Sequence, residues 1–315
     1  MTAPRVLVTG AAGFIGSTLV EALLKKDTAV TGVDAFTSNY NPAQKRSNIA
    51  SALTNPSFRL IEADIRSAPL EPLLEDVTHV VHLAALPGVR ASWGDPFRAY
   101  AEHNVTATQR LLEALRAHPV ERIVVASSSS VYGLPTRFPT PEDEMPRPIS
   151  PYGVTKLATE ALLHAYWASF RLPVVSLRYF TVYGPRQRSD MGIHNFFEAA
   201  RAGTPVSIYG DGSQTRDFTF VDDAVAATME ALFRPAVPGL VYNIGGGHRV
   251  TLHDLLASIE LVSGLTIERR LVAPPPGDPR DTSADTSRAR RDLGYEPRTD
   301  LTQGLRRQWE WHRSR

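Results

Sequence analysis

The sequence predicts an α/β fold of the Rossmann type, a doubly wound parallel sheet followed by a smaller C-terminal α/β lobe. Six short runs rich in Val, Ile and Leu recur in the first 180 residues and barely alternate with polar residues. This pattern is typical of strands that are covered on both faces. Segments with helical periodicity separate the runs, and such strand–helix–strand alternation favours a parallel sheet.

The expected strands and helices follow one another in order along the chain. The strands are expected at residues 5–10, 29–34, 58–64, 79–85, 122–128 and 173–180, and the helices between them at 14–25, 100–117 and 151–170. Residues 1–178 would form the first domain and residues 179–315 the smaller lobe, with elements around 205–245, such as 205–209 and 241–246, returning to the first domain. Further helices are expected at residues 221–233, 252–262 and 301–312.

Composition excludes several classes of function. Lys and Arg total 34 against 33 for Asp and Glu, which leaves no electrostatic footprint for nucleic acid. The chain has no Cys, so it has no disulfide and no thiolate metal site, and this agrees with a reducing cytoplasm. No apolar run approaches the roughly 20 residues of a membrane span, and no signal-peptide pattern precedes the first strand. The nine histidines are scattered, so no metal site is expected.

The segment VTGAAGFIG joins the first expected strand to the first helix and predicts a dinucleotide site. Gly10 allows the tight turn, Gly13 lets the backbone approach a pyrophosphate, and Gly16 lets the helix pack close to the strand. The helix N-terminus offers unpaired amides to phosphates. Asp34 ends the next strand, where a carboxylate accepts hydrogen bonds from a ribose diol and repels a 2′-phosphate, which favours NAD over NADP.

Other cofactor-binding candidates lie at the helix start and at later strand ends. Asp64 is expected to contact adenine together with its neighbour, although a turn-capping role for Asp64 is nearly as well supported. The remaining candidates are small or apolar residues at the same rim: Phe14, Ile15, Ile65, Leu83, Ala84 and Ala85.

Tyr152 and Lys156 stand four residues apart at the start of an expected helix, so their side chains share one face. Hydride transfer from an alcohol to a nicotinamide needs a base for the hydroxyl proton. A free tyrosine has a pKa of about 10, and a nearby ammonium favours the phenolate. We therefore expect Tyr152 to be the base and Lys156 to lower its pKa.

These motifs resemble the extended short-chain dehydrogenase/reductase superfamily. The glycine triplet with Tyr152-x-x-x-Lys156 carries the general resemblance, and SSSSVYG, SPYGVTK and RDF are similar to nucleotide-sugar epimerases and dehydratases. The resemblance covers essentially the whole chain and implies NAD as cofactor, a UDP-sugar substrate, a nucleotide-sugar-binding second lobe and a homodimer formed through residues 100–117 and 151–170. It also makes Ser128, four residues before Tyr132, the partner of the reacting hydroxyl. By residue type alone Ser127, Ser129 and Ser130 could take that role, or all four serines could only satisfy backbone groups.

Ser129 and Ser130 distinguish between reactions within this family. The 4,6-dehydratases resemble one another in having Asp-Glu at these positions, and the decarboxylases have Glu at the second. Serine hydroxyls are poor proton carriers near neutral pH, so elimination is not expected here. The resemblance then implies oxidation, rotation and reduction at C4 through a transient 4-keto sugar.

The segment LRYFTVYGPRQRSDM is similar to UDP-glucuronate 4-epimerases, as are DAFTSNYNPAQKRSN and AALPGVRASW, which contains Arg90. Arg is the natural two-pronged partner of a uronate carboxylate, and Arg188 matches the family arginine credited with that contact, with Thr181 nearby. Alternatively, Arg186 and Arg188 serve the diphosphate or solvent. The function alternatives are a UDP-glucose or UDP-N-acetylglucosamine 4-epimerase, and a non-catalytic NAD-sensing protein.

The resemblance assigns roles to four further residues. Tyr179 would neighbour the nicotinamide amide, Arg216 would hold the diphosphate, Tyr209 would pack on uracil, and Arg280 would reach the nucleotide. Many relatives carry Arg where this chain has Pro275, which puts one diphosphate contact in doubt.

Overall fold

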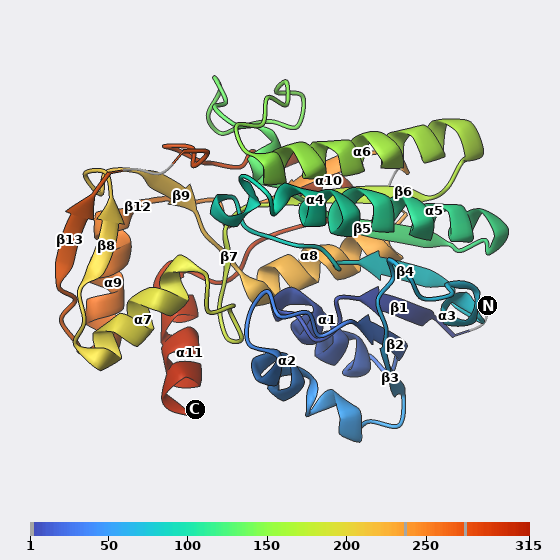
Figure 1. Ribbon diagram of the computed structural model, residues 1–315, viewed down its shortest axis with the longest axis horizontal. Coiled ribbons are helices and arrows are strands. Elements are labelled where there is room, and N and C mark those ends of the chain that lie inside the picture. Colours follow the sequence, from blue (N-terminus) through green and yellow to red (C-terminus); the bar gives the residue numbers. More distant parts are fainter. Residues whose placement is uncertain (1–2, 236–237, 274–275) are drawn as a thin grey trace.

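The computed structural model describes residues 3–235, 238–273 and 276–315, so Pro275 lies outside the described residues. Its centre is a seven-stranded sheet in the order β11-β6-β5-β4-β1-β2-β3, with every neighbouring pair parallel (Figure 1). This confirms the predicted fold class. The strands are β1 (Arg5–Thr9), β2 (Ala29–Asp34), β3 (Phe58–Glu62), β4 (His79–His82), β5 (Arg122–Ser128), β6 (Val174–Tyr179) and β11 (Val241–Ile244).

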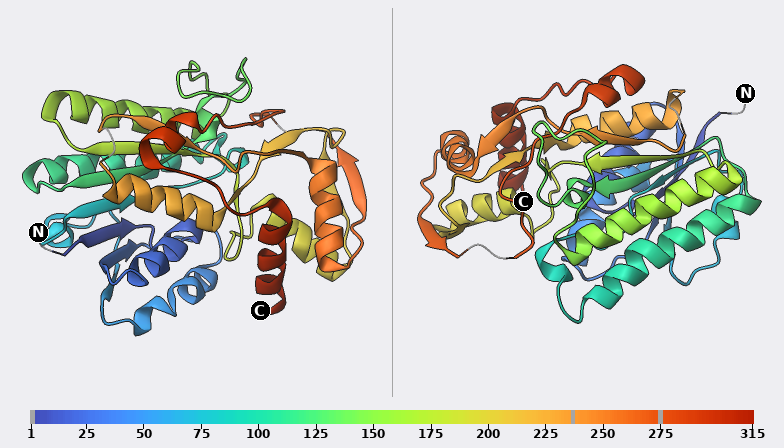
Figure 2. Two further views of the ribbon diagram at one scale, coloured as in Figure 1. Left: turned by 180° about the vertical axis from the view of Figure 1, so that it is seen from behind. Right: turned by 90° about the horizontal axis from the view of Figure 1, so that it is seen from above.

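Helices cover both faces of this sheet (Figure 1, Figure 2). In β1, Val6 and Val8 belong to the core beneath α1 (Phe14–Leu24) and α8 (Val221–Phe233), whereas Leu7 belongs to the core beneath α5 (Ala107–Ala117) and α6 (Pro151–Phe170). Successive strand residues point to opposite faces, so both sets are apolar. The absence of apolar–polar alternation that predicted a doubly covered sheet therefore follows from burial on both sides.

The helix that carries Tyr152 and Lys156 has clear start and stop signals. Ser150 caps α6 by accepting a hydrogen bond from the Gly153 amide at 3.1 Å, and Pro151 occupies the first turn. The helix ends at Arg171, which adopts the left-handed conformation with φ 58°. These signals lie in the local sequence, and the predicted range 151–170 is confirmed.

The helix predicted at residues 100–117 is interrupted. It consists of α4 (Phe97–Tyr100), a π-helical turn (Ala101–Thr106) and α5. In that turn Asn104 hydrogen-bonds both main-chain groups of Leu86 and the hydroxyl of Thr155 on α6. The irregular turn thus fixes the loop that follows β4, at the rim of the sheet where the strands end.

The second lobe is built around α7 (Gly192–Ala202), α9 (Leu252–Ser263) and α11 (Leu301–Arg313), with three two-stranded sheets. As expected, residues 241–244 return to the large sheet, where β11 pairs with β6. The same expectation for residues 205–209 is wrong, because β8 pairs with β13 inside the second lobe. The paired strands are β7 (Val182–Tyr183) with β10 (Thr219–Phe220), β9 (Thr215–Asp217) with β12 (Arg249–Thr251), and β8 (Val206–Tyr209) with β13 (Arg269–Val272).

Helices α8, α9 and α11 agree with prediction to within one residue at each end, whereas α7 and the shorter helices α2 (Pro42–Ile49), α3 (Glu71–Leu74) and α10 (Ser287–Leu293) were not predicted. Helix α7 has no side-chain cap and begins with Gly192, so the sequence carries no start signal for it. Within the described residues, no helix combines the length and the apolar character that a membrane span requires. The remaining elements are η1 (Ala52–Thr54), η2 (Arg90–Ser92) and η4 (Ser129–Val131).

Candidate active site

A cavity of about 890 Å³ follows the carboxyl ends of the strands and extends into the second lobe. Its size is that of a pocket for a large cofactor or drug-sized ligand. Of the predicted site residues, Arg280 does not line it. The residues that do are Gly10, Gly13, Phe14, Ile15, Gly16, Asp34, Asp64, Ile65, Leu83, Ala84, Ala85, Arg90, Ser128, Ser129, Ser130, Tyr152, Lys156, Tyr179, Thr181, Arg188, Tyr209 and Arg216.

The glycine turn has the geometry that a phosphate cradle needs. Gly10 has φ +72°, and a Cβ there would lie 2.8 Å from the Ala84 amide nitrogen. A Cβ on Gly16 would lie 2.1 Å from the Gly10 carbonyl oxygen, so the helix can approach the strand only without one. No side chain caps α1 at Gly13, which leaves the first-turn amides facing the cavity end of the helix. This open, uncapped helix start fits a dinucleotide pyrophosphate.

Asp34 is buried beside this turn and is anchored by the backbone. One carboxylate oxygen accepts from the Ala12 amide at 3.0 Å and the other from the Phe36 amide at 2.8 Å. Each oxygen keeps a free lone pair. The side chain is therefore held rigidly with acceptor capacity remaining, which fits recognition of a ribose diol.

Asp64 has the turn-capping role, and its expected contact with adenine stays a prediction. It accepts hydrogen bonds from the Arg66 amide at 2.9 Å and from the Arg66 guanidinium at 2.6 Å, and these bonds hold the pKa of Asp64 below its usual range. At the same time Asp64 and Ile65 line the cavity. The turn-capping role is present, and the side chain is anionic beside the cofactor end of the site.

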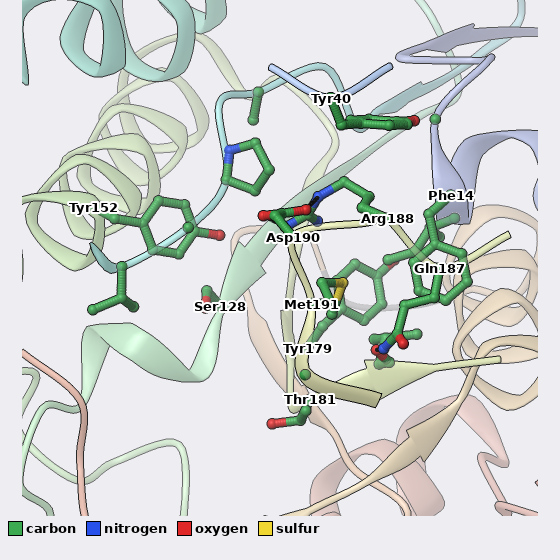
Figure 3. Close-up of a pocket in the computed structure, with 18 of the residues that line it drawn as sticks. Phe14, Tyr40, Ser128, Tyr152, Tyr179, Thr181, Gln187, Arg188, Asp190 and Met191 are labelled. Carbon is green, nitrogen blue, oxygen red and sulfur yellow. Dashed lines mark hydrogen bonds and ion pairs between the residues drawn. The ribbon is translucent and has the colours of Figure 1, made fainter. Parts of the chain in front are cut away.

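Tyr152 points its hydroxyl into the pocket near Ser128 (Figure 3). Burial raises the pKa of Tyr152, while a hydrogen bond with Ser128 and the positive charge of Arg188 oppose that rise. Lys156 is not among the groups that shift the pKa of Tyr152: its Nζ donates to the Ala126 carbonyl oxygen at 2.8 Å, and burial lowers the pKa of Lys156 to about 8, which leaves the ammonium mostly protonated at pH 7. In the protein alone, the groups that favour the phenolate are thus Ser128 and Arg188.

A buried hydrogen-bond and ion-pair network between α6 and the sheet supports the helix that carries Tyr152. Arg178 on β6 forms an ion pair with Glu160 on α6 at 2.7 Å, and it also donates to the Tyr132 hydroxyl at 2.8 Å. Ser127 donates to Glu160, and Tyr132 donates to Asn243 on β11 at 2.7 Å. The Ser127 hydroxyl is therefore occupied by Glu160, although Ser127 lines the cavity together with the three serines that follow it. The network links α6 to β5, β6 and β11 and so fixes the position of the helix that carries Tyr152 relative to the sheet.

Arg188 brings a cation into the same cavity. Its Nε and Nη2 bind the two oxygens of Asp190 at 2.9 and 3.0 Å, so one edge of the guanidinium is occupied (Figure 3). The Nη1 side is left for a second planar anion. The Arg188 side chain is only 17 % exposed, and Thr181 lines the pocket with it. This arrangement fits a carboxylate better than a neutral group.

A second basic group lies at the far end of the cavity. The Arg90 guanidinium lies over the Tyr209 ring at 4.0 Å from its centroid, and Arg90 and Arg216 both approach Asp278, at 3.1 and 3.5 Å. Two cations share one carboxylate, so the cluster keeps a net positive charge that suits a diphosphate. Arg280 is exposed, and it contributes its carbonyl oxygen, which accepts from Arg216 Nη1 at 2.9 Å.

Tyr179, at the end of β6, lines the cavity. Its hydroxyl is hydrogen-bonded to Thr228 on α8 at 2.7 Å, and burial raises the pKa of Tyr179 to about 12. The phenol therefore stays protonated and presents a ring face to the cavity. This position fits a neighbour of the nicotinamide.

Several lining residues had not been singled out as site residues. Lys45 donates to Thr37 and Asn39 at 2.8 to 3.0 Å and lies over the Tyr40 ring, which organises the loop after β2. That loop belongs to DAFTSNYNPAQKRSN, so a signal existed in the sequence. Gln187, Asp190 and Met191 belong to LRYFTVYGPRQRSDM, so a signal existed for them too. Asn195 and Phe196 lie on α7, which was not predicted, and Asp278 comes from a distant loop.

This fold, with a glycine turn at one end of the cavity and a Tyr–Ser pair at its centre, defines an NAD-binding sugar-nucleotide enzyme. The model of the NAD dependent epimerase/dehydratase family matches residues 6–245, and the chain belongs to that family.

Particular relatives resemble the chain over nearly all of its length. The uncharacterized UDP-glucose epimerase YtcB of Bacillus subtilis is 45 % identical over 302 residues, which cover 96 % of this chain and 95 % of YtcB. UDP-glucuronate 4-epimerase 1 of Arabidopsis thaliana is 38 % identical over 98 % of this chain and 76 % of its own. The structure of UDP-glucuronic acid 4-epimerase from Bacillus cereus with UDP-glucuronic acid and NAD superposes with a TM-score of 0.96 at 43 % identity, over 98 % and 99 % of the two chains.

Proposed function

We propose that this protein is an NAD-dependent 4-epimerase that interconverts UDP-glucuronate and UDP-galacturonate. One observation carries the proposal: a single cavity joins the glycine turn, the Tyr152–Ser128 pair and Arg188. The similar Bacillus cereus enzyme was solved with UDP-glucuronic acid and NAD, the ligands that these three parts would hold.

The protein's residues divide the work as follows. NAD, when bound, would supply a hydride acceptor, and inversion requires that the hydride return to the opposite face of C4. Tyr152 removes the proton of the 4-hydroxyl and later gives it back, and Ser128 orients that hydroxyl by hydrogen bonding. Lys156, whose Nζ is fixed by the Ala126 carbonyl, lies where it can hold the ribose of the nicotinamide nucleotide. The glycine turn and Asp34 keep the cofactor in place between turnovers.

The two positions that follow Ser128 offer no carboxylate for elimination or decarboxylation. Ser129 and Ser130 line the cavity next to Ser128, and both are hydroxyls that stay neutral near pH 7. The Ser128 hydroxyl donates to that of Ser130 at 3.1 Å, so these side chains form a hydrogen-bonding edge and not a proton relay between carboxylates. This supports simple inversion at C4.

Arg188 supports the choice of a uronate. A partly buried cation with a free guanidinium edge is well matched to a carboxylate, and a neutral hexose would leave that edge unpaired. A UDP-glucose 4-epimerase is the second candidate, because the similar YtcB is named as a UDP-glucose epimerase.

The test is to incubate the purified protein with UDP-glucuronate, UDP-glucose and UDP-N-acetylglucosamine and to separate the C4 epimers chromatographically. Conversion of UDP-glucuronate is expected to be fastest. Conversion of a neutral sugar alone would reject the uronate assignment. Tyr152→Phe is expected to abolish turnover while NAD stays bound. If wild type and variant both bind NAD and neither turns over any sugar, the protein is a non-catalytic NAD-binding protein.

We also propose a homodimer through α5 and α6. Val154 and Phe170 on α6 are 47 % and 49 % exposed, which leaves apolar surface on the helix pair. Light scattering is expected to give twice the mass of the chain, and a monomer mass would contradict this. The cytoplasmic location and the domain division at residue 178 stay predictions.

A further inference from the structure

Three potential metal ligands meet in the second lobe, far from one another in the sequence. His194 and Glu198 are one turn apart on α7, and His312 lies on α11. One donor atom from each residue lies within 4.8 Å of the other two. The two helices lie side by side in Figure 1 and Figure 2. Histidines that looked scattered in the sequence therefore form a cluster once α7 and α11 pack together.

The hydrogen bonds around the cluster leave imidazole nitrogens free. His194 is hydrogen-bonded through Nδ1 to the Gln187 carbonyl oxygen at 3.0 Å, so Nδ1 carries the proton and Nε2 keeps its lone pair. His312 is fully buried and is hydrogen-bonded through Nδ1 to Glu198 at 2.7 Å, and its Nε2 has no hydrogen-bond partner among the described residues. Because Nδ1 is the nitrogen that faces Glu198, an ion shared with Glu198 would bind His312 through Nδ1 and take the place of the proton in that hydrogen bond.

The donor set has the charge that a divalent ion requires. A metal ion binds neutral imidazoles and an ionised carboxylate. Two such imidazoles and one carboxylate carry a net charge of −1, which offsets half of the charge of a divalent ion.

We propose that His194, Glu198 and His312 form a binding site for a divalent first-row transition metal, with Zn²⁺ as the expected occupant. Two imidazoles with one carboxylate suit this class of ion, whereas Mg²⁺ and Ca²⁺ prefer all-oxygen sites. Zinc with bonds of about 2.0–2.1 Å holds tetrahedral donors roughly 3.4 Å apart. The 2.7 Å between His312 Nδ1 and Glu198 therefore has to widen, and donors as far apart as 4.8 Å have to approach. The Glu198 side chain is 46 % exposed, so it can move and can admit the ion and a water ligand.

The site would brace the segment that carries Arg188. Gln187 accepts hydrogen bonds through its side-chain oxygen from the His194 amide at 2.9 Å and from Gln308 on α11 at 2.8 Å. Gln187 also lines the large cavity and precedes Arg188. An ion that joins α7 to α11 would therefore stabilise both helices and the loop between β7 and α7. Binding itself does not depend on the proposed enzymatic function.

The test uses the full-length, chelator-treated protein and Zn²⁺ alone, followed by calorimetry and by competition with a chromophoric chelator. One Zn²⁺ per chain and a higher unfolding temperature with zinc are expected. Co²⁺ in place of zinc should give visible d–d absorption bands of a low-coordinate site. Glu198→Gln, at a position exposed enough to tolerate the change, should weaken zinc binding at least tenfold.

His248→Ala is the matched control, because His248 is exposed and lies outside the cluster. It should bind zinc as the wild type does. Zinc binding that is equal in Glu198→Gln and wild type, or lost in His248→Ala, would overturn the assignment. Absence of stoichiometric binding to the wild type would overturn it as well. Each of these results is independent of whether the protein turns over a uronate.

Discussion

Replacement of Arg188 by Met tests how the site chooses a uronate. The guanidinium is 17 % exposed, its Nε–Nη2 edge is bound to Asp190, and its other edge faces the cavity. Met keeps much of the length of the side chain and removes the charge. We expect Arg188→Met to reduce kcat/KM for UDP-glucuronate strongly. The kcat/KM for UDP-glucose should change by less than about threefold, because a neutral sugar makes no ion pair with Arg188.

The expected loss has two parts. A hydrogen-bonded contact to a charged group contributes about 1.5–3 kcal/mol. Without Arg188, the Asp190 carboxylate also repels the uronate: two like charges roughly 6 Å apart repel by about 3 kcal/mol at an effective dielectric constant of about 20. Asp190 is 46 % exposed, and solvent screening reduces this term to about 1 kcal/mol. The sum of about 2.5–4 kcal/mol corresponds to a loss of roughly 10²- to 10³-fold.

The double variant Arg188→Met/Asp190→Asn checks the second part. Removing the Asp190 charge should recover about fivefold of the activity on UDP-glucuronate, the equivalent of about 1 kcal/mol. Initial rates are measured by separation of the epimers, with Kd by calorimetry for any sugar that is not converted, and with thermal unfolding to verify the fold. Equal losses on UDP-glucuronate and UDP-glucose would show that Arg188 serves the shared diphosphate or the fold and would refute the reasoning.

Two further predictions concern the base and the glycine turn. Burial raises the pKa of Tyr152, and the hydrogen bond with Ser128 lowers it, so the reaction rate should rise with pH as the phenolate forms. Ser128→Ala should move that rise to higher pH in a profile of rate against pH. An unchanged profile would exclude a role of Ser128 in lowering the pKa of Tyr152. Gly16→Ala puts a Cβ 2.1 Å from the Gly10 carbonyl oxygen and should lower the free energy of unfolding, measured by denaturant titration, by about 3 kcal/mol or more. Gly192→Ala is the control, because no atom lies nearer than 3.7 Å to its Cβ, and it should change the free energy of unfolding by less than about 0.5 kcal/mol. Equal effects of the two substitutions would contradict the close-packing argument.

The similarity of this chain to enzymes named for different sugars gives Arg188 particular weight. In the proposed mechanism the glycine turn, Tyr152 and Ser128 act on the cofactor and on C4, which a uronate and a hexose share, so they cannot decide between the two sugars. Arg188 and Asp190 lie in the same cavity but belong to the segment between β7 and α7. Selectivity can therefore change in that segment while the chemistry of inversion stays the same.

The sequence by itself determined the parts of the site whose geometry is local. A glycine triplet between a strand and a helix constrains its own backbone, and Tyr152 and Lys156 share a helix face because they are one turn apart. The six leading strands could be predicted for a similar reason: burial on both faces leaves a continuous apolar run, and that run is visible without knowledge of the neighbours.

Only the tertiary structure decided which groups meet across long separations in the chain. It turned Ser127 toward Glu160 and left Ser128 beside Tyr152, it gave Lys156 the Ala126 carbonyl as partner, and it placed β8 against β13. It also brought His312 to His194 across 118 positions. Such contacts depend on how helices and strands pack, and side-chain spacing along the sequence carries information about neighbours on one element only.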